Sequence, residues 1–119
     1  MVGIKVVSTG HAVPDKVVTN DDLSRVVDTN DEWIYSKTGI KERHFCENET
    51  NWELALKAAD TAIERAGIDK SEIGMLIVAT FTPDYATPSI ACVLHEKMGL
   101  RTDIPSFDLN AACAGYVYG

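Results

Sequence analysis

The stretch that decides the fold runs from residue 75 to residue 109 and reads MLIVATFTPDYATPSIACVLHEKMGLRTDIPSFDL. Residues 75–80 are apolar on both faces, which is typical of a central parallel strand. A helix is predicted next, with Thr87 as its N-cap, a proline in its first turn and Gly99 at its end. Residues 105–109 predict a second strand. Strand, helix and strand in this order predict a right-handed parallel crossover and an α/β protein.

The start of the chain predicts a strand, a loop and a short helix. Residues 3–9, GIKVVST, are rich in β-branched side chains and predict the first strand. Residues 10–18 contain a Pro-Asp pair and predict a loop. Asn20 and Asp21 are expected to open a helix, because apolar residues with helical spacing follow them: Leu23, Val26 and Val27.

A second helix is predicted from the capping pattern at Thr29. Thr29 and Glu32 have the spacing of a capping box, in which each side chain satisfies a free backbone amide at the helix start. The helix is expected to reach about Thr38 and to end at Gly39. Residues 40–46 are charged and predict at most a short edge strand.

The third predicted helix has the clearest pattern in the chain. Thr50 and Glu53 form another capping box, and Gly67 stands where the helix should end. One face is lined by small and apolar side chains, which would let a sheet or another helix approach closely: Trp52, Ala55, Ala59, Ala62 and Ala66.

Composition excludes several classes of protein. The chain has 119 residues, 45% of them hydrophobic and 24% charged, which suits one modest globular domain. Its net charge of −7 argues against a nucleic-acid-binding surface. No apolar run approaches the length of a membrane span, and the N-terminus lacks the pattern of a signal peptide. We therefore expect neither a nucleic-acid nor a membrane partner, and a cytoplasmic location.

Cysteine and histidine spacing predicts neither a disulfide framework nor a metal site. The three cysteines are Cys46, Cys92 and Cys113, and no two of them form a C-x-x-C pair. The three histidines are scattered: His11, His44 and His95.

Cys113 lies in the sequence NAACAG, where a strand ends and a helix is expected to begin. Active sites of open α/β sheets lie beyond the carboxyl ends of strands. A helix N-terminus stabilises a thiolate, and backbone amides there can bind an oxyanion. The alternative is that Cys113 is a small buried apolar residue, which is the common state of a free cysteine. The pattern alone leaves both interpretations open.

Residues 113–119, CAGYVYG, predict the first turns of an apolar helix with nothing after them. Such a helix must be buried against further structure. We therefore expect the chain to be a fragment, the front part of a longer protein.

Four blocks of the chain, in order, resemble one family: residues 8–23, 28–45, 86–100 and 107–119. They read STGHAVPDKVVTNDDL, DTNDEWIYSKTGIKERHF, ATPSIACVLHEKMGL and FDLNAACAGYVYG, and they resemble 3-oxoacyl-acyl-carrier-protein synthase III. This family contains the condensing enzymes that initiate type II fatty-acid synthesis. The resemblance implies a thiolase-type fold with a mainly parallel mixed sheet, flanking helices and two similar halves. Residues 1–119 would be most of the first half.

The resemblance also implies a reaction. Cys113 would take an acyl group from acyl-coenzyme A, and decarboxylative condensation with malonyl-acyl carrier protein would follow. These two molecules are substrates, and no separate cofactor or metal is implied. The histidine and asparagine that assist decarboxylation in the family belong to its second half, outside this chain. A homodimer is expected.

Four further residues receive roles from the resemblance. Thr29, Trp33 and Lys37 match positions that contact coenzyme A, and at this spacing they would share one helix face. Where this chain has Lys37, the family often has arginine, whose planar fork lysine lacks. Thr87 matches a position that lines the acyl pocket, supplied by the partner subunit. From the residues alone, Trp33 could instead be packed in a core and Thr87 could be only a helix cap.

Two other functions remain open at this point. The longer protein could be a thiolase-fold relative of secondary metabolism that loads a different acyl group. The 119-residue chain by itself could be a non-catalytic piece that exposes apolar surface and self-associates.

Overall fold

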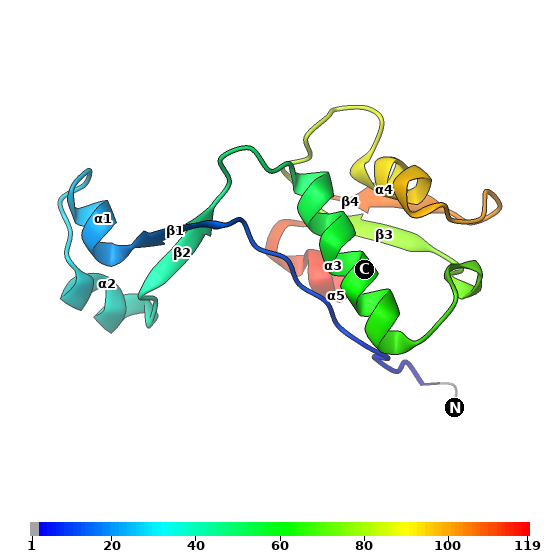
Figure 1. The fold of residues 1–119 in the computed structure, drawn as a ribbon, viewed down its shortest axis with the longest axis horizontal. Coiled ribbons are helices and arrows are strands. Elements are labelled where there is room, and N and C mark those ends of the chain that lie inside the picture. The colour runs from blue at the N-terminus through cyan, green and yellow to red at the C-terminus, as the bar shows by residue number, and fades with distance from the viewer. Residues whose placement is uncertain (1–2) are drawn as a thin grey trace. The chain divides into compact units, whose positions relative to one another are not determined.

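The computed structural model describes residues 3–119 and shows two compact units (Figure 1). The larger unit combines the N-terminal segment up to Ala12 with Thr50–Gly119. The smaller unit is Val13–Glu49. None of the helices within residues 3–119 is long and apolar enough to cross a bilayer.

A parallel two-stranded sheet forms the centre of the larger unit. Strand β3 (Leu76–Ala79) pairs with β4 (Ser106–Leu109), and helix α4 (Ile90–Met98) connects them. Leu76 lies opposite Ser106, and Ala79 lies opposite Leu109. The predicted strand, helix and parallel strand are therefore confirmed.

Helices lie on both faces of this sheet. Leu76 and Val78 pack against the core that α4 contributes to. Ile77 and Ala79 alternate with them and so point to the opposite face. Helix α5 (Gly115–Tyr118) lies there, because a β-carbon at Gly115 would be 3.0 Å from Ala79 Cβ. The larger unit is thus a three-layer α/β structure.

The core of the larger unit is centred on α4. Its buried apolar residues are Ile90, Leu94, Met98, Leu100 and Ile104. Helix α3 (Asn51–Ala66) packs against them with Trp52, Ala55, Leu56, Ala59 and Ile63. Its capping box and its end at Gly67 are as predicted. Each large apolar side chain that is fully buried contributes about 1.5–3 kcal/mol, so this α3–α4 contact is a main source of stability.

The start of α4 differs from the prediction. The helix begins at Ile90 with Ser89 as N-cap, so the prediction that Thr87 is the cap is wrong. The reason is Asp108 on β4, whose carboxylate accepts hydrogen bonds from Ile90 N at 2.9 Å and Ala91 N at 2.8 Å. These bonds fix the first free amides of the helix at this position.

The predicted strand at residues 3–9 is absent among the described residues 3–9, so this prediction is wrong. Ser8 Oγ donates to Ala62 O of α3 at 2.6 Å, and Arg65 Nη1 donates to Thr9 O at 3.0 Å. Gly10 permits this close approach, because a β-carbon there would lie 2.0 Å from Ala58 O. Strand propensity does not produce a strand where the backbone pairs with no neighbouring strand.

The smaller unit contains an antiparallel pair and two helices. Strand β1 (Lys16–Thr19) pairs with β2 (Glu42–Phe45), with Lys16 opposite Phe45. The strand expected within residues 40–46 is confirmed, whereas the loop predicted through residue 18 is wrong. The Pro-Asp turn ends before Lys16, and the β-branched residues after it pair with β2.

Both helices of the smaller unit begin at caps other than those predicted. Helix α1 (Asn20–Ser24) is capped by Thr19, which forms a capping box with Asp22. Helix α2 (Asp31–Thr38) is capped by Asn30, whose side chain accepts from Trp33 N at 2.8 Å. The capping box predicted for Thr29 is therefore wrong. The end of α2 at Gly39 is confirmed, with φ at 70°.

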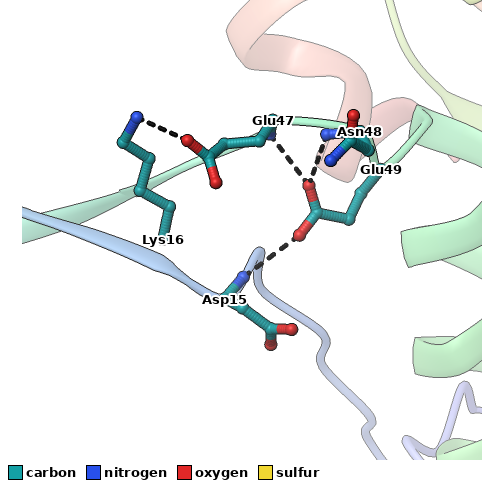
Figure 2. Close-up of polar contacts among 5 residues, drawn as sticks. All are labelled: Asp15, Lys16, Glu47, Asn48 and Glu49. Carbon is teal, nitrogen blue, oxygen red and sulfur yellow. Dashed lines mark hydrogen bonds and ion pairs between the residues drawn. The ribbon is translucent and has the colours of Figure 1, made fainter.

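Glu49 ties together the segments before β1 and after β2 (Figure 2). Its carboxylate accepts hydrogen bonds from Asp15 N at 3.2 Å, Glu47 N at 2.9 Å and Asn48 N at 3.1 Å. These backbone amides, that of Glu47 foremost, lower the pKa of Glu49 to about 2. Beside them, Lys16 Nζ pairs with Glu47 Oε1 at 2.6 Å. Residues 3–119 also include two short 3₁₀ turns, Lys70–Glu72 and Ala112–Ala114.

Candidate active site

Cys113 lies in the turn between β4 and α5, at the strand-to-helix junction that the sequence predicts. Strand β4 ends at Leu109, the 3₁₀ turn Ala112–Ala114 contains the cysteine, and α5 starts at Gly115. The side chain is a free, exposed thiol. The alternative of a small buried apolar residue is wrong for this chain.

The backbone just before Cys113 has an unusual conformation. Ala112 has φ at 43°, in the left-handed region that residues other than glycine rarely adopt. This conformation costs about 1–3 kcal/mol and is found most often at functional sites. The surrounding turn holds the strained residue, and the strained turn presents the next side chain to solvent.

The turn also lies directly on the end of β3. Gly115 is buried, and a β-carbon there would lie 3.0 Å from Ala79 Cβ, the last residue of that strand. Thr80 N donates to Leu109 O at 3.2 Å, which keeps the two strand ends together. Cys113 is therefore placed beyond the carboxyl ends of both parallel strands, where α/β proteins carry their active sites.

Two backbone amides next to Cys113 donate hydrogen bonds within the turn. Ala114 N donates to Ala111 O at 2.9 Å, and Gly115 N donates to Ala112 O. An oxyanion would have to use other donors, so the expectation that the amides around Cys113 bind it fails for these two.

The two other cysteines and two of the histidines lie on other elements of the chain. Cys46 follows β2 in the smaller unit, and Cys92 lies on α4. His44 Nδ1 lies 2.6 Å from Pro14 O, and His95 Nδ1 lies 2.7 Å from Ser106 Oγ at the amino end of β4. Across the described part of the chain, no group of three or more His, Cys, Asp or Glu residues is placed to hold a metal ion.

Trp33 and Lys37 lie one turn apart on the same face of α2. Trp33 is 58% exposed, so the alternative in which it is packed in a core is wrong. Thr29 precedes the helix, and the expectation that all three share one helix face is wrong for Thr29. Its Oγ1 is buried and has no hydrogen-bond partner among the described residues.

Thr87 is exposed in the loop between β3 and α4 of the larger unit. An interaction that the sequence analysis missed holds this loop. Both carboxylate oxygens of Asp84 accept bonds from the first amides of α3, from Asn51 N and Trp52 N, each at 2.9 Å. The sequence carries no local signal for this contact, because Asp84 lies 33 residues after Asn51.

Comparison with known proteins gives close relatives. No family model matches the chain. It is 50% identical over 118 residues to the β-ketoacyl-acyl-carrier-protein synthase III of Clostridium acetobutylicum, covering 99% of this chain and 36% of that protein. The crystal structure of 3-oxoacyl-acyl-carrier-protein synthase III from Aquifex aeolicus is similar with a TM-score of 0.91 at 40% identity, covering 98% of this chain and 37% of that one. The priming β-ketosynthase of the R1128 polyketide pathway has a TM-score of 0.87 at 34% identity, covering 96% of this chain and 34% of that one.

These matches confirm the predicted α/β, thiolase-like fold class. They extend over nearly the whole of this chain, which spans 36% of the length of the clostridial relative. The chain is therefore similar to proteins named β-ketoacyl-acyl-carrier-protein synthase III, over a segment of about a third of the relative's length.

Proposed function

We propose that this chain is the front part of an initiating 3-oxoacyl synthase in which Cys113 is the acyl-accepting nucleophile. The observation that carries the proposal is the position of Cys113. Its thiol is exposed beyond the carboxyl ends of β3 and β4, directly after the strained residue Ala112. The chain's 50% identity to a named synthase III supports the same reaction.

The reaction has two steps. The Cys113 thiolate attacks the thioester carbonyl of acyl-coenzyme A, a new carbon–sulfur bond forms, and coenzyme A leaves as a thiolate that takes up a proton. Malonyl-acyl carrier protein then loses carbon dioxide, and the resulting carbanion attacks the acyl-cysteine. This releases the Cys113 thiolate and gives 3-oxoacyl-acyl carrier protein. The histidine and asparagine for decarboxylation would come from outside this chain.

Helix α2 supplies the proposed contacts to coenzyme A. The exposed indole of Trp33 is suited to stack on adenine, and Lys37, one turn later, is suited to bind phosphate. The unpartnered hydroxyl of Thr29 adds a polar group before the helix. Thr87 would line the acyl pocket from a partner subunit, so a homodimer belongs to the proposal, as does a cytoplasmic location.

Replacement of the thiol tests the proposal. In the full-length protein, Cys113→Ala should abolish acyl transfer from acyl-coenzyme A, because no sulfur remains to form the thioester. Intact-mass spectrometry of the protein after incubation with acetyl-coenzyme A measures the added acyl group. The matched control is Cys46→Ala, which removes another free, exposed thiol and should leave acylation unchanged. Acylation of the Cys113→Ala protein at the wild-type rate would contradict the assignment.

A second candidate is a relative of secondary metabolism that loads a different acyl group. The structural similarity to the R1128 priming ketosynthase favours it as the alternative. A panel of acyl-coenzyme A primers, read as mass added at Cys113, separates the two. Labelling by acetyl- or short branched acyl-coenzyme A supports the fatty-acid role. Labelling only by other primers supports the alternative.

A further inference from the structure

Asn20 is the buried polar residue of the smaller unit, with 1% of its surface exposed. Its Nδ2 donates two hydrogen bonds, each 2.8 Å long, one to Asp31 Oδ1 and one to Ile40 O. Asp31 is the first residue of α2, and Ile40 follows Gly39, which ends that helix. A single side-chain amide therefore holds both ends of α2.

Arg43 fixes the orientation of this amide. Its Nη2 donates to Asn20 Oδ1, and its Nη1 donates to Val18 O at 3.0 Å. The Asn20 oxygen therefore faces the guanidinium, and the nitrogen faces the two acceptors of α2. Both donors and the acceptor of the amide are engaged, which is the state expected of a buried polar group that contributes to stability.

Helix α2 depends on such contacts because it has no buried residue of its own. Most protein helices are held by an apolar face packed into a core. Here the polar contacts at the two ends replace that packing. Trp33 and Lys37 lie between these ends and are exposed, so the position of the helix sets the position of both side chains.

We propose that Asn20 is a positioning residue for coenzyme A binding. It holds α2, and through it Trp33 and Lys37, in place to receive the nucleotide part of the substrate. This rests on the proposed function of α2. Asn20 does not touch the reacting atoms, so its loss should affect recognition of the nucleotide and not acyl transfer itself.

The test compares two substrates in the full-length enzyme: acetyl-coenzyme A and acetyl-N-acetylcysteamine, which lacks the nucleotide. Asn20→Ala should raise KM for acetyl-coenzyme A about tenfold, the size expected for a lost buried hydrogen-bond pair, with kcat unchanged. KM for the truncated thioester should stay at the wild-type value. A merely structural role would instead reduce the rate with both substrates, and that result would overturn the proposal.

Two further variants sharpen the test. Asn20→Asp keeps the size of the side chain and the Arg43 contact but places an acceptor against Asp31 and Ile40 O. It should also raise KM for acetyl-coenzyme A and leave KM for the truncated thioester unchanged. Asp21→Asn changes the exposed neighbour on the same helix and should have no effect. If both Asn20 variants behave as wild type, the inference is wrong.

A double substitution separates this inference from the proposed function. Trp33→Ala alone should raise KM for acetyl-coenzyme A, and Asn20→Ala should raise KM less in the Trp33→Ala background than in the wild type, because part of its effect runs through the Trp33 contact. An unchanged KM in Trp33→Ala would contradict the coenzyme A site itself. A raised KM in Trp33→Ala, together with a fully additive effect of Asn20→Ala, would contradict only the positioning role.

Discussion

The carboxylate of Glu49 links two segments of the smaller unit by hydrogen bonds. It accepts bonds from three backbone amides, those of Asp15, Glu47 and Asn48, and so joins the segments that flank β1 and β2. Only the ionised carboxylate accepts all three bonds well, which is why its pKa falls from the ordinary 4.5 to about 2.

The lowered pKa of Glu49 predicts a pH dependence of stability. Because the folded-state pKa lies below the unfolded value, the stabilisation is fully present above about pH 4.5 and is lost as the pH falls toward 2. Glu49→Gln should lower the unfolding free energy near neutral pH. The variant should also lose less unfolding free energy than the wild type as the pH falls from about 4.5 to 2. Urea unfolding as a function of pH measures this. Glu64→Gln, at an exposed site on α3, is the control and should keep the wild-type profile.

At the scale of elements, periodicity and caps predicted several features that are set within a few residues, although the caps of α1 and α2 are also local and differ from those predicted. The end of α2 at Gly39 and both ends of α3 are local and were predicted correctly. The start of α4 was not, because its cap involves Asp108, which lies 18 residues after Ile90. The strand predicted at residues 3–9 failed for the same reason, since pairing depends on distant backbone.

The residues of the candidate site also differ in how far the sequence pattern predicts them. The junction that carries Cys113 follows from a strand ending before an apolar helix, and it was predicted. The roles of Trp33 and Lys37 came from resemblance, because an exposed indole on a short helix has no local signature. The sequence predicts Asn20 only as a residue that opens a helix. In the structure, its side chain donates hydrogen bonds to Asp31 and Ile40, which lie 11 and 20 residues further along the chain. Sequence alone could not show them.

The contact between Gly115 and Ala79 predicts a pair of compensating substitutions. Gly115→Ala would place a β-carbon 3.0 Å from Ala79 Cβ, so the turn that carries Cys113 would have to shift. We expect a loss of about 1–3 kcal/mol in unfolding free energy and slower acylation of Cys113 in the full-length enzyme. Ala79→Gly in the same protein removes the opposing atom and should restore much of the acylation rate. Urea unfolding and intact-mass kinetics measure the two effects, and an additive double mutant would contradict the contact.

At the scale of the whole molecule, the 119-residue chain exposes many large apolar side chains. In the larger unit they include Ile4, Val6, Val7, Phe107, Tyr116, Val117 and Tyr118. Exposed large apolar side chains favour association between protein molecules. The chain produced alone should therefore self-associate.

Gel filtration with light scattering checks the self-association. The expected result is a mass above that of one chain, rising with concentration. Replacing Tyr116 and Tyr118 by serine, which removes two exposed rings of α5, should shift the distribution toward the monomer. A concentration-independent monomer of the unaltered chain would show that the exposed side chains do not drive association.

The absence of any buried residue in α2 has an evolutionary consequence. Side chains that pack into a core can change only together with their neighbours, whereas the exposed Trp33 and Lys37 of α2 can be exchanged one at a time. In the coenzyme A site that we propose, exchanges at positions such as Lys37 adjust the affinity for the nucleotide while Asn20 and Arg43 keep the helix in place. Under this proposal the exposed side chains of α2 contact the ligand and Asn20 holds the helix, so the contacts can diverge between relatives while the helix keeps its place.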